Sequence, residues 1–148
     1  MKWLSDHIQM PEGWEFYNAS AETGLIDTAL ADSMIILKGT TDVAIADIDY
    51  VKLFDTARGI RVAIELEKQV QKKDCMQAIL KLIAANCHSN YSIMTLLTNL
   101  RQTWHCYWIN RDGIQECWFE PPHGIAFVES HLRGERKTIG CLYNARLF

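Results

Sequence analysis

The pattern of hydrophobic and polar residues predicts two helices in the first two thirds of this chain. Apolar residues recur at helical spacing from residue 20 to about residue 32, behind the cap candidates Asn18 and Ser20. A clearer helix is predicted for residues 69–87, because its apolar side chains recur three and four positions apart. That stripe consists of Met76, Ile79, Leu80, Ile83 and Cys87.

Short runs rich in Val, Ile and aromatic residues predict β-strands between and after these helices. The runs are residues 34–37, 42–46, 60–67, 93–97, 104–109, 114–119 and 138–143. The first three follow one another closely, so we expect an antiparallel meander. Residues 110–113, Asn-Arg-Asp-Gly, have the chemistry of a hairpin turn, and residues 124–132 predict a short closing helix. This order predicts an α/β fold, a mixed sheet with helices packed against it.

Aromatic residues also gather near the N-terminus, in residues 1–17. Trp3, Trp14, Phe16 and Tyr17 stand there among polar residues, which is typical of a docking arm or of a short helix and loop. The chain has 148 residues, 49% of them apolar, a length and composition that suit one domain with its own core.

Charge and cysteine content narrow the classes of function. Fifteen Lys and Arg against eighteen Asp and Glu leave a net charge of -3, which argues against a sequence-blind polyanion binder held by bulk charge. A local basic face remains compatible with this balance. No run of about 18 apolar residues occurs, and the first residues lack the apolar stretch of a signal peptide, so neither a membrane span nor export is expected. The five cysteines are odd in number and widely spaced, which favours a reducing compartment over a disulfide framework.

Candidate chemistry lies in the strand predicted for residues 60–67. Alternate residues of a strand share a face, so Glu65 and Glu67 point the same way. Asp42 opens the preceding strand, and if the two strands pair, Asp42 and Glu65 can converge at one end of the sheet. Their oxygens would suit a hard cation such as Mg²⁺. The alternative, which composition alone favours, is a solvated face with Arg61 and Lys68 as loose surface partners.

Other candidate sites have weaker patterns. The histidines and cysteines show no spacing typical of zinc sites. A cysteine nucleophile would need a histidine within reach. The adjacent pairs Cys87-His88 and His105-Cys106 would place their side chains on opposite faces of a strand.

The order of these parts resembles a known superfamily. An acidic residue, Glu22, in a predicted helix is followed by Gly-Thr-Thr-Asp-Val-Ala-Ile at 39–45, Ile-Glu-Leu-Glu-Lys at 64–68, and a helix that bears Gln77. This succession resembles the PD-(D/E)XK nuclease superfamily.

A narrower resemblance, over roughly residues 20–110, is to the nuclease-like C-terminal domains of Crinkler-type effectors. It rests on short motifs at residues 77–79, 84–86, 97–100 and 104–108, which read Gln-Ala-Ile, Ala-Ala-Asn, Leu-Thr-Asn-Leu and Trp-His-Cys-Tyr-Trp.

The resemblance implies an α/β fold with a restriction-endonuclease-like core. A single nuclease domain would span residues 1–148, with an N-terminal arm at 1–18, the core at 19–110 and a C-terminal extension at 111–148. It also implies an effector-type protein, secreted as part of a longer chain and acting inside a host cell, with the nucleus as one destination.

The implied activity is hydrolysis of nucleic acid that depends on Mg²⁺ or Mn²⁺, with DNA favoured over RNA. Asp42 and Glu65 would bind the metal, and Glu22 would support the metal or its water. Gln77 would position water or a phosphate from the following helix.

The chain departs from the family motif at position 67, where the motif has Lys and this sequence has Glu67. Lys68 comes one residue late and should face the other side of the strand unless a bulge realigns it. A Glu-x-Glu version of the motif would make Glu67 a base or a further metal ligand. Alternatively, the fold has lost catalysis and serves as an interaction module that binds host proteins.

A basic surface could receive the phosphate backbone of the nucleic acid. Its candidate residues are Lys68, Lys72, Lys73, Lys81 and Arg101. The outer face of a helix is usually charged and solvated, which explains several of them without any ligand. A homodimer, formed through the aromatic hairpin or the Trp-rich N-terminal segment, is a further expectation, and no membrane is expected as a partner.

Overall fold

The computed structural model describes residues 1–134 and the backbone of residues 146–147. The strand predicted for residues 138–143 lies outside the described residues. Within the described part, seven strands form one mixed sheet in the order β1-β4-β5-β6-β7-β8-β9. Their bounds are β1 Trp14–Tyr17, β4 Val43–Asp47, β5 Ile60–Leu66, β6 Met94–Thr98, β7 Trp104–Asn110, β8 Gly113–Phe119 and β9 Arg146–Leu147.

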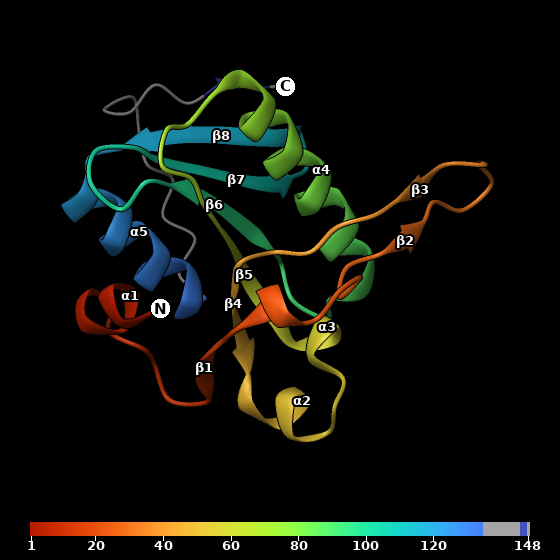
Figure 1. Cartoon of the computed structure of the whole chain (residues 1–148), viewed down its shortest axis with the longest axis horizontal. Coiled ribbons are helices and arrows are strands. Elements are labelled where there is room, and N and C mark those ends of the chain that lie inside the picture. Colours follow the sequence, from red (N-terminus) through yellow and green to blue (C-terminus); the bar gives the residue numbers. More distant parts are fainter. Residues whose placement is uncertain (135–145, 148) are drawn as a thin grey trace.

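Strand direction follows from the connections. Neighbouring strands are antiparallel except β5 and β6, which run parallel and are joined by the helix α4 (Lys72–His88). A parallel pair needs such a crossover, since a short hairpin cannot return the chain to the same end. The predicted α/β class, a mixed sheet flanked by helices, is confirmed (Figure 1).

Helices cover both faces of the sheet. The helix α4 packs on one face, and α1 (Lys2–His7) and α5 (Pro121–Leu132) pack on the other (Figure 1). Two short helices, α2 (Ile48–Lys52) and α3 (Thr56–Gly59), connect β4 to β5. Among the described residues, no helix is both long enough and apolar enough to cross a membrane.

The helix predicted for residues 20–32 is wrong. That segment holds a 3₁₀ turn, η1 (Ala19–Ala21), and then the strand β2 (Thr28–Ala29), which pairs with β3 (Ile36–Leu37) in a hairpin that projects from the body (Figure 1). Gly24 adopts a positive φ of 77°, which interrupts a helix. Asp27 accepts a hydrogen bond from the Gly39 N–H at 2.9 Å and so ties the two legs of the hairpin together.

The predicted meander is partly wrong as well. β4 and β5 are antiparallel neighbours as predicted, but β3 does not join the main sheet. Its expected place beside β4 belongs to β1, from the segment predicted to be an arm or a short helix and loop. The short helix is confirmed by α1, whereas Trp14 and Phe16 alternate inward along an edge strand and pack against the core.

The long helix is confirmed, and Ile79 of the predicted stripe is buried, but the packed side is rotated away from Met76 and Leu80. Met76 and Leu80 of the predicted stripe are 51% and 45% exposed. The buried side carries Ala78, Leu82 and Ala85. Alanine lets a helix backbone approach a sheet closely, and a pattern ranked by hydrophobic size overlooks it. A capping box between Gln71 and Asp74 starts the helix three residues later than predicted.

The aromatic hairpin is confirmed. Asn110 pairs with Gly113, leaving a two-residue turn, and Gly113 adopts a φ of 115°. The closing helix α5 begins at Pro121, three residues before its predicted start, because proline is well accommodated in the first helical turn. A Cβ on Gly124 would lie 2.7 Å from Trp104 Cε3, so glycine lets α5 approach the sheet.

Candidate functional site

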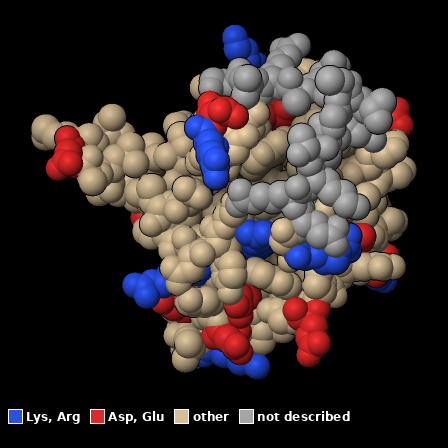
Figure 2. All heavy atoms as spheres, turned by 180° about the vertical axis from the view of Figure 1, so that it is seen from behind, with Lys and Arg blue, Asp and Glu red and all other residues tan. Residues whose placement is uncertain are grey.

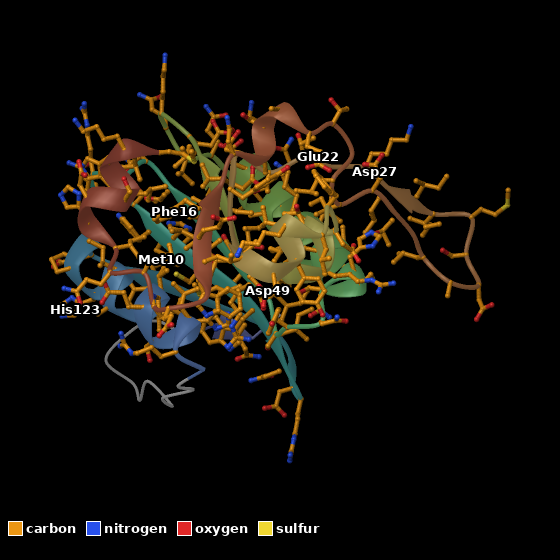
Figure 3. All side chains as sticks on the ribbon, turned by 90° about the horizontal axis from the view of Figure 1, so that it is seen from below. Met10, Phe16, Glu22, Asp27, Asp49 and His123 are labelled. Carbon is orange, nitrogen blue, oxygen red and sulfur yellow. The ribbon has the colours of Figure 1, made fainter. Side chains whose placement is uncertain are left out.

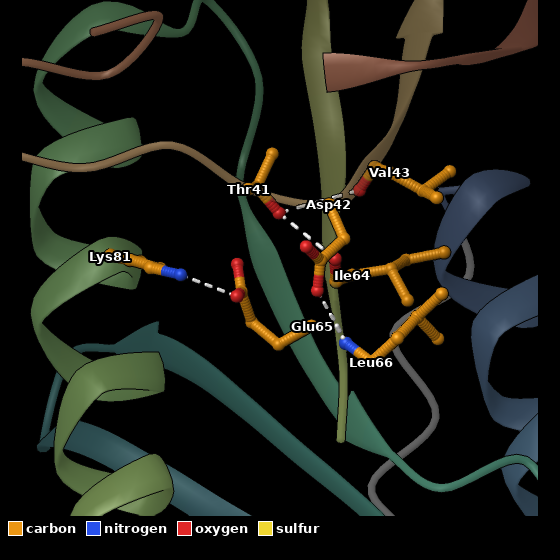
Figure 4. A network of polar contacts seen from close by, with 7 residues as sticks. All are labelled: Thr41, Asp42, Val43, Ile64, Glu65, Leu66 and Lys81. Atoms are coloured by element: carbon orange, nitrogen blue, oxygen red, sulfur yellow. Dashed lines mark hydrogen bonds and ion pairs between the residues drawn. The ribbon is translucent and has the colours of Figure 1, made fainter. Parts of the chain in front are cut away.

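The pairing of β4 and β5 brings Asp42 and Glu65 to one end of the sheet. Val43 pairs with Ile64, and the same antiparallel register places Asp42 opposite Glu65. Asp42 Oδ2 accepts a hydrogen bond from the Leu66 N–H at 2.8 Å, which extends the contact of the two strands beyond their ladder. Thr41 donates its hydroxyl to the Ile64 carbonyl at 3.0 Å (Figure 4). The loop before β4 is therefore fixed against β5.

Glu65 is the central residue of this site. Only 6% of it is exposed, and its Oε2 forms an ion pair with Lys81 Nζ from α4 (Figure 4). Its other oxygen, Oε1, is buried and has no hydrogen-bond partner among the described residues. A buried acceptor without a donor is costly, which makes Glu65 unlike a surface carboxylate. The alternative of a solvated face is wrong for Glu65.

Burial and nearby charges act on Glu65 in opposite directions. Desolvation is the largest effect and raises the pKa of Glu65. The Lys81 ammonium and the Thr41 hydroxyl lower it, and the Asp42 charge raises it, with a net result above the ordinary value. Glu65 is therefore harder to ionise than a surface carboxyl group.

Lys81 is the residue that sequence reasoning placed wrongly. We expected it on the charged outer face of the helix, but its side chain is half-buried and reaches the sheet. Lys81 comes three residues after Ala78 and four before Ala85, both buried, so it borders the packed side. That spacing was the signal in the sequence for the position of Lys81. The predicted stripe consisted of larger side chains and left out the alanines that form the packed side.

Several other predicted residues surround a hollow next to Glu65. The hollow has a volume of about 770 Å³, and its lining includes Glu67, Lys68, Lys73 and Gln77. Gln77 also lines a second groove of about 440 Å³, together with Lys81 and residues of the 36–40 segment. The end of β5, the first turns of α4 and the short segment between them thus meet around one open space.

The Glu22 carboxylate pairs with a residue outside the Asp42 and Glu65 pair. Glu22 follows β1 in the segment that leads to the hairpin (Figure 3), and its carboxylate accepts a hydrogen bond from the Tyr17 hydroxyl at 2.5 Å. In the described part of the chain it has no hydrogen bond or ion pair with Asp42 or Glu65. The hydrogen bond to Glu22 raises the pKa of Tyr17.

Lys72 and Arg101 are exposed, on α4 and on the β6–β7 loop respectively. Figure 2 shows basic and acidic side chains interspersed over the face seen from behind. On this face the charges form no single basic patch.

The two carboxylates at this end of the sheet suit a hard cation. Glu65 Oε1 is buried without a partner and Asp42 lies beside Glu65, which are oxygen donors of the kind that Mg²⁺ and Mn²⁺ prefer. Across residues 1–134, no cluster of three or more His, Cys, Asp or Glu is arranged to hold a metal ion. A cation here would have to complete its shell with water or with phosphate oxygens.

Comparison with known proteins supports an effector-type chain. The chain is 35% identical, over 80 residues and 52% of its length, to Crinkler effector protein 2 of Phytophthora infestans. The aligned part covers 18% of that protein, so the chain spans about a fifth of the length of its relative. The similarity bears out the resemblance to Crinkler-type effectors. No family model matches the chain, and no solved structure matches it.

Proposed function

We propose that this chain is a metal-dependent nuclease domain of an effector, which hydrolyses phosphodiester bonds of nucleic acid, with DNA favoured over RNA. The observation that carries the proposal is the buried Glu65 carboxylate, placed between Asp42 and Lys81 at one end of the sheet. Similarity to a Crinkler effector supports the effector context. The proposal includes action inside a host cell, with the nucleus as one destination, as part of a longer secreted chain.

Asp42 and Glu65 would hold Mg²⁺ or Mn²⁺ together. Glu65 Oε1 has no hydrogen-bond donor in the described part of the chain, so a cation would satisfy an atom that is otherwise costly to bury. Once bound, such an ion activates water and offsets the charge that develops on the leaving group.

Lys81 supplies the positive charge that the missing lysine at position 67 would supply in the family motif. It approaches Glu65 from α4 instead of from β5, and its ammonium can stabilise negative charge on a phosphate held at the site. This arrangement explains how Glu67 can occupy the lysine position without leaving the site short of a cation.

Residues of the adjoining hollow would handle substrate and water. Glu67 is half-exposed there and can accept a proton from the attacking water, and Gln77 can orient that water or a phosphate oxygen. Lys68 and Lys73 line the same hollow, and Lys72 and Arg101 would extend the backbone contacts.

Cleavage of plasmid DNA and of RNA in Mg²⁺ or Mn²⁺ tests this function. We expect EDTA to abolish cleavage, and Glu65→Gln, Asp42→Asn and Lys81→Met each to lower the rate about 10²–10³-fold. Glu22→Gln is the matched control, since its carboxylate is tied to Tyr17, and it should cut at nearly the wild-type rate. The nuclease proposal fails if wild-type protein cuts neither nucleic acid, or if Glu65→Gln cuts as fast as wild type.

The alternative, an inert interaction module that binds host proteins, has one observation in its favour. Glu65 Oε2 is already paired with Lys81, and Asp42 Oδ2 with the Leu66 N–H, so each carboxylate has a partner within the protein without any ion. Calorimetric titration with Mn²⁺ separates the two functions. Binding that is lost in Asp42→Asn supports the nuclease, whereas no binding, together with no cleavage, supports the interaction module.

A further inference from the structure

A second group of reactive side chains lies under α4, outside the site described above. Cys75 Sγ is 4.0 Å from His105 Nδ1, and the same ring nitrogen is 3.9 Å from Glu116 Oε1. These residues come from α4, β7 and β8 and are far apart in sequence. Cys75 and His105 are 30 residues apart, so they were not among the adjacent Cys and His pairs considered from the sequence.

The surroundings hold His105 in a defined position. Its ring stacks on Trp118 with the ring centroids 4.5 Å apart and the planes inclined by 17°. Glu116 is 5% exposed, and its Oε1 accepts hydrogen bonds from Tyr107 Oη at 3.0 Å and from Trp118 Nε1 at 2.7 Å. The carboxylate and the imidazole are thus fixed next to the thiol.

The burial of His105 and the nearby charge of Glu116 allow its imidazole to accept a proton. Burial is the larger effect on His105 and lowers its pKa, so the ring is neutral near pH 7, while the Glu116 charge acts in the opposite direction. An imidazolium formed by proton uptake would lie beside the Glu116 carboxylate, which stabilises it.

The four described cysteines differ in exposure. Cys75 is partly exposed and Cys87 is exposed, both on α4, whereas Cys106 and Cys117 are buried. Burial raises the pKa of Cys106 well above its ordinary value and that of Cys117 to about 11, so neither should react while the protein is folded. Among the four described cysteines, Cys75 alone combines partial exposure to solvent with a histidine nitrogen near its sulfur.

We infer that Cys75 is a nucleophilic thiol with His105 as its proton acceptor, and that it is a site of covalent modification by small uncharged electrophiles. In the reaction with an alkyl halide, an S–C bond forms as the C–halogen bond breaks and halide leaves with the bonding electrons. The thiol proton passes to His105 Nδ1. Glu116 is a positioning residue that stabilises the imidazolium. The inference does not rest on the proposed nuclease activity.

Site-resolved alkylation of the full chain by iodoacetamide at pH 7, followed by peptide mass spectrometry, tests the inference. Cys87 is an internal reference on the same helix, and we expect Cys75 to react about tenfold faster although it is less exposed. His105→Gln should remove that advantage and leave the Cys87 rate unchanged. Glu116→Gln should slow Cys75 by a smaller factor.

The labelling also reports whether each variant is folded. Cys106 and Cys117 stay unlabelled in a folded chain, so their labelling would identify a variant that has lost its structure. If His105→Gln has lost its structure, the test rests on the ratio of the Cys75 and Cys87 labelling rates in wild type and on the Cys75 rate in Glu116→Gln. The inference is overturned if Cys75 reacts no faster than Cys87 in wild type, or if a folded His105→Gln keeps the wild-type Cys75 rate.

Discussion

The two faces of the central sheet differ in chemistry although they belong to the same strands. On β5, Val62 and Ile64 point toward α1 and α5, and Ala63 and Glu65 point toward α4. The first face is a continuous apolar core that includes Met94, Leu96, Trp104 and Val128. The α4 face combines a second apolar cluster, which includes alanines as well as large side chains such as Leu82 and Tyr107, with buried polar residues, among them Glu65, Thr95, His105 and Glu116.

The difference shows a division of roles within one sheet. Burial of large apolar side chains stabilises the fold, and it occurs on both faces. Polar groups under α4 must be desolvated as well, and among the described residues Glu65 Oε1 and Thr95 Oγ1 are buried there without hydrogen-bond partners, as Trp104 Nε1 is on the other face. Glu65 and His105, on which the two proposed sites depend, both lie on the α4 face.

Truncation of a side chain in the apolar face under α1 and α5 should have the largest effect on the free energy of unfolding. Ile64 is fully buried, so Ile64→Ala removes buried methyl groups and leaves a cavity. We expect a loss of about 2–5 kcal/mol in the free energy of unfolding, measured by urea denaturation. Ile36→Ala is the matched control, since Ile36 is 62% exposed and should lose less than about 0.5 kcal/mol. Equal losses in the two variants would contradict the assignment of the core to this face.

Removal of one partner of the ion pair should have a smaller effect. Lys81→Met leaves the Glu65 carboxylate buried without its cation, with an expected cost of about 1–3 kcal/mol at pH 7. The double variant Lys81→Met/Glu65→Gln removes both charges and should recover most of that loss. A denaturation cycle over the four proteins measures the coupling, and strict additivity of the single losses would show that the pair does not interact.

The smallest expected effect is a difference between wild type and Glu65→Gln in how stability depends on pH. The pKa of Glu65 is raised in the folded protein, mainly by burial, so the folded state binds its proton more tightly than the unfolded state. The contribution of Glu65 to stability therefore falls as pH rises from the ordinary carboxyl range through the raised value. Denaturation of wild type and Glu65→Gln from pH 4 to 8 should show this decline in wild type only. A parallel pair of curves would contradict the raised pKa.

Local patterns predicted much of the fold. Runs rich in Val, Ile and aromatic residues identified β4, β5, β6, β7 and β8, and the turn at residues 110–113 predicted the hairpin that joins the last two. Asp42 and Glu65 were expected to meet because adjacent antiparallel strands place opposite residues together, and the structure brings them together. These features depend on neighbours in sequence or on one strand pairing.

Features that depend on distant parts of the chain were missed. Residues 20–32 have helical spacing, but Gly24 and the contact of Asp27 with Gly39 favour the hairpin. The contact of Lys81 with Glu65 depends on the rotation of α4, which its buried alanines decide. The approach of Cys75 to His105 depends on the same packing.

The sequence by itself determined the α/β class, the strands from β4 to β8 and the two acidic residues that share one end of the sheet. Those features follow from the periodicity of helices and strands, which can be recognised in each segment without the rest of the chain. The tertiary structure alone decided which side of α4 is buried, and with it which lysine neutralises Glu65 and which histidine approaches Cys75. The physical reason is that close packing selects side chains by their fit against the sheet, and no single segment contains the surface against which it packs.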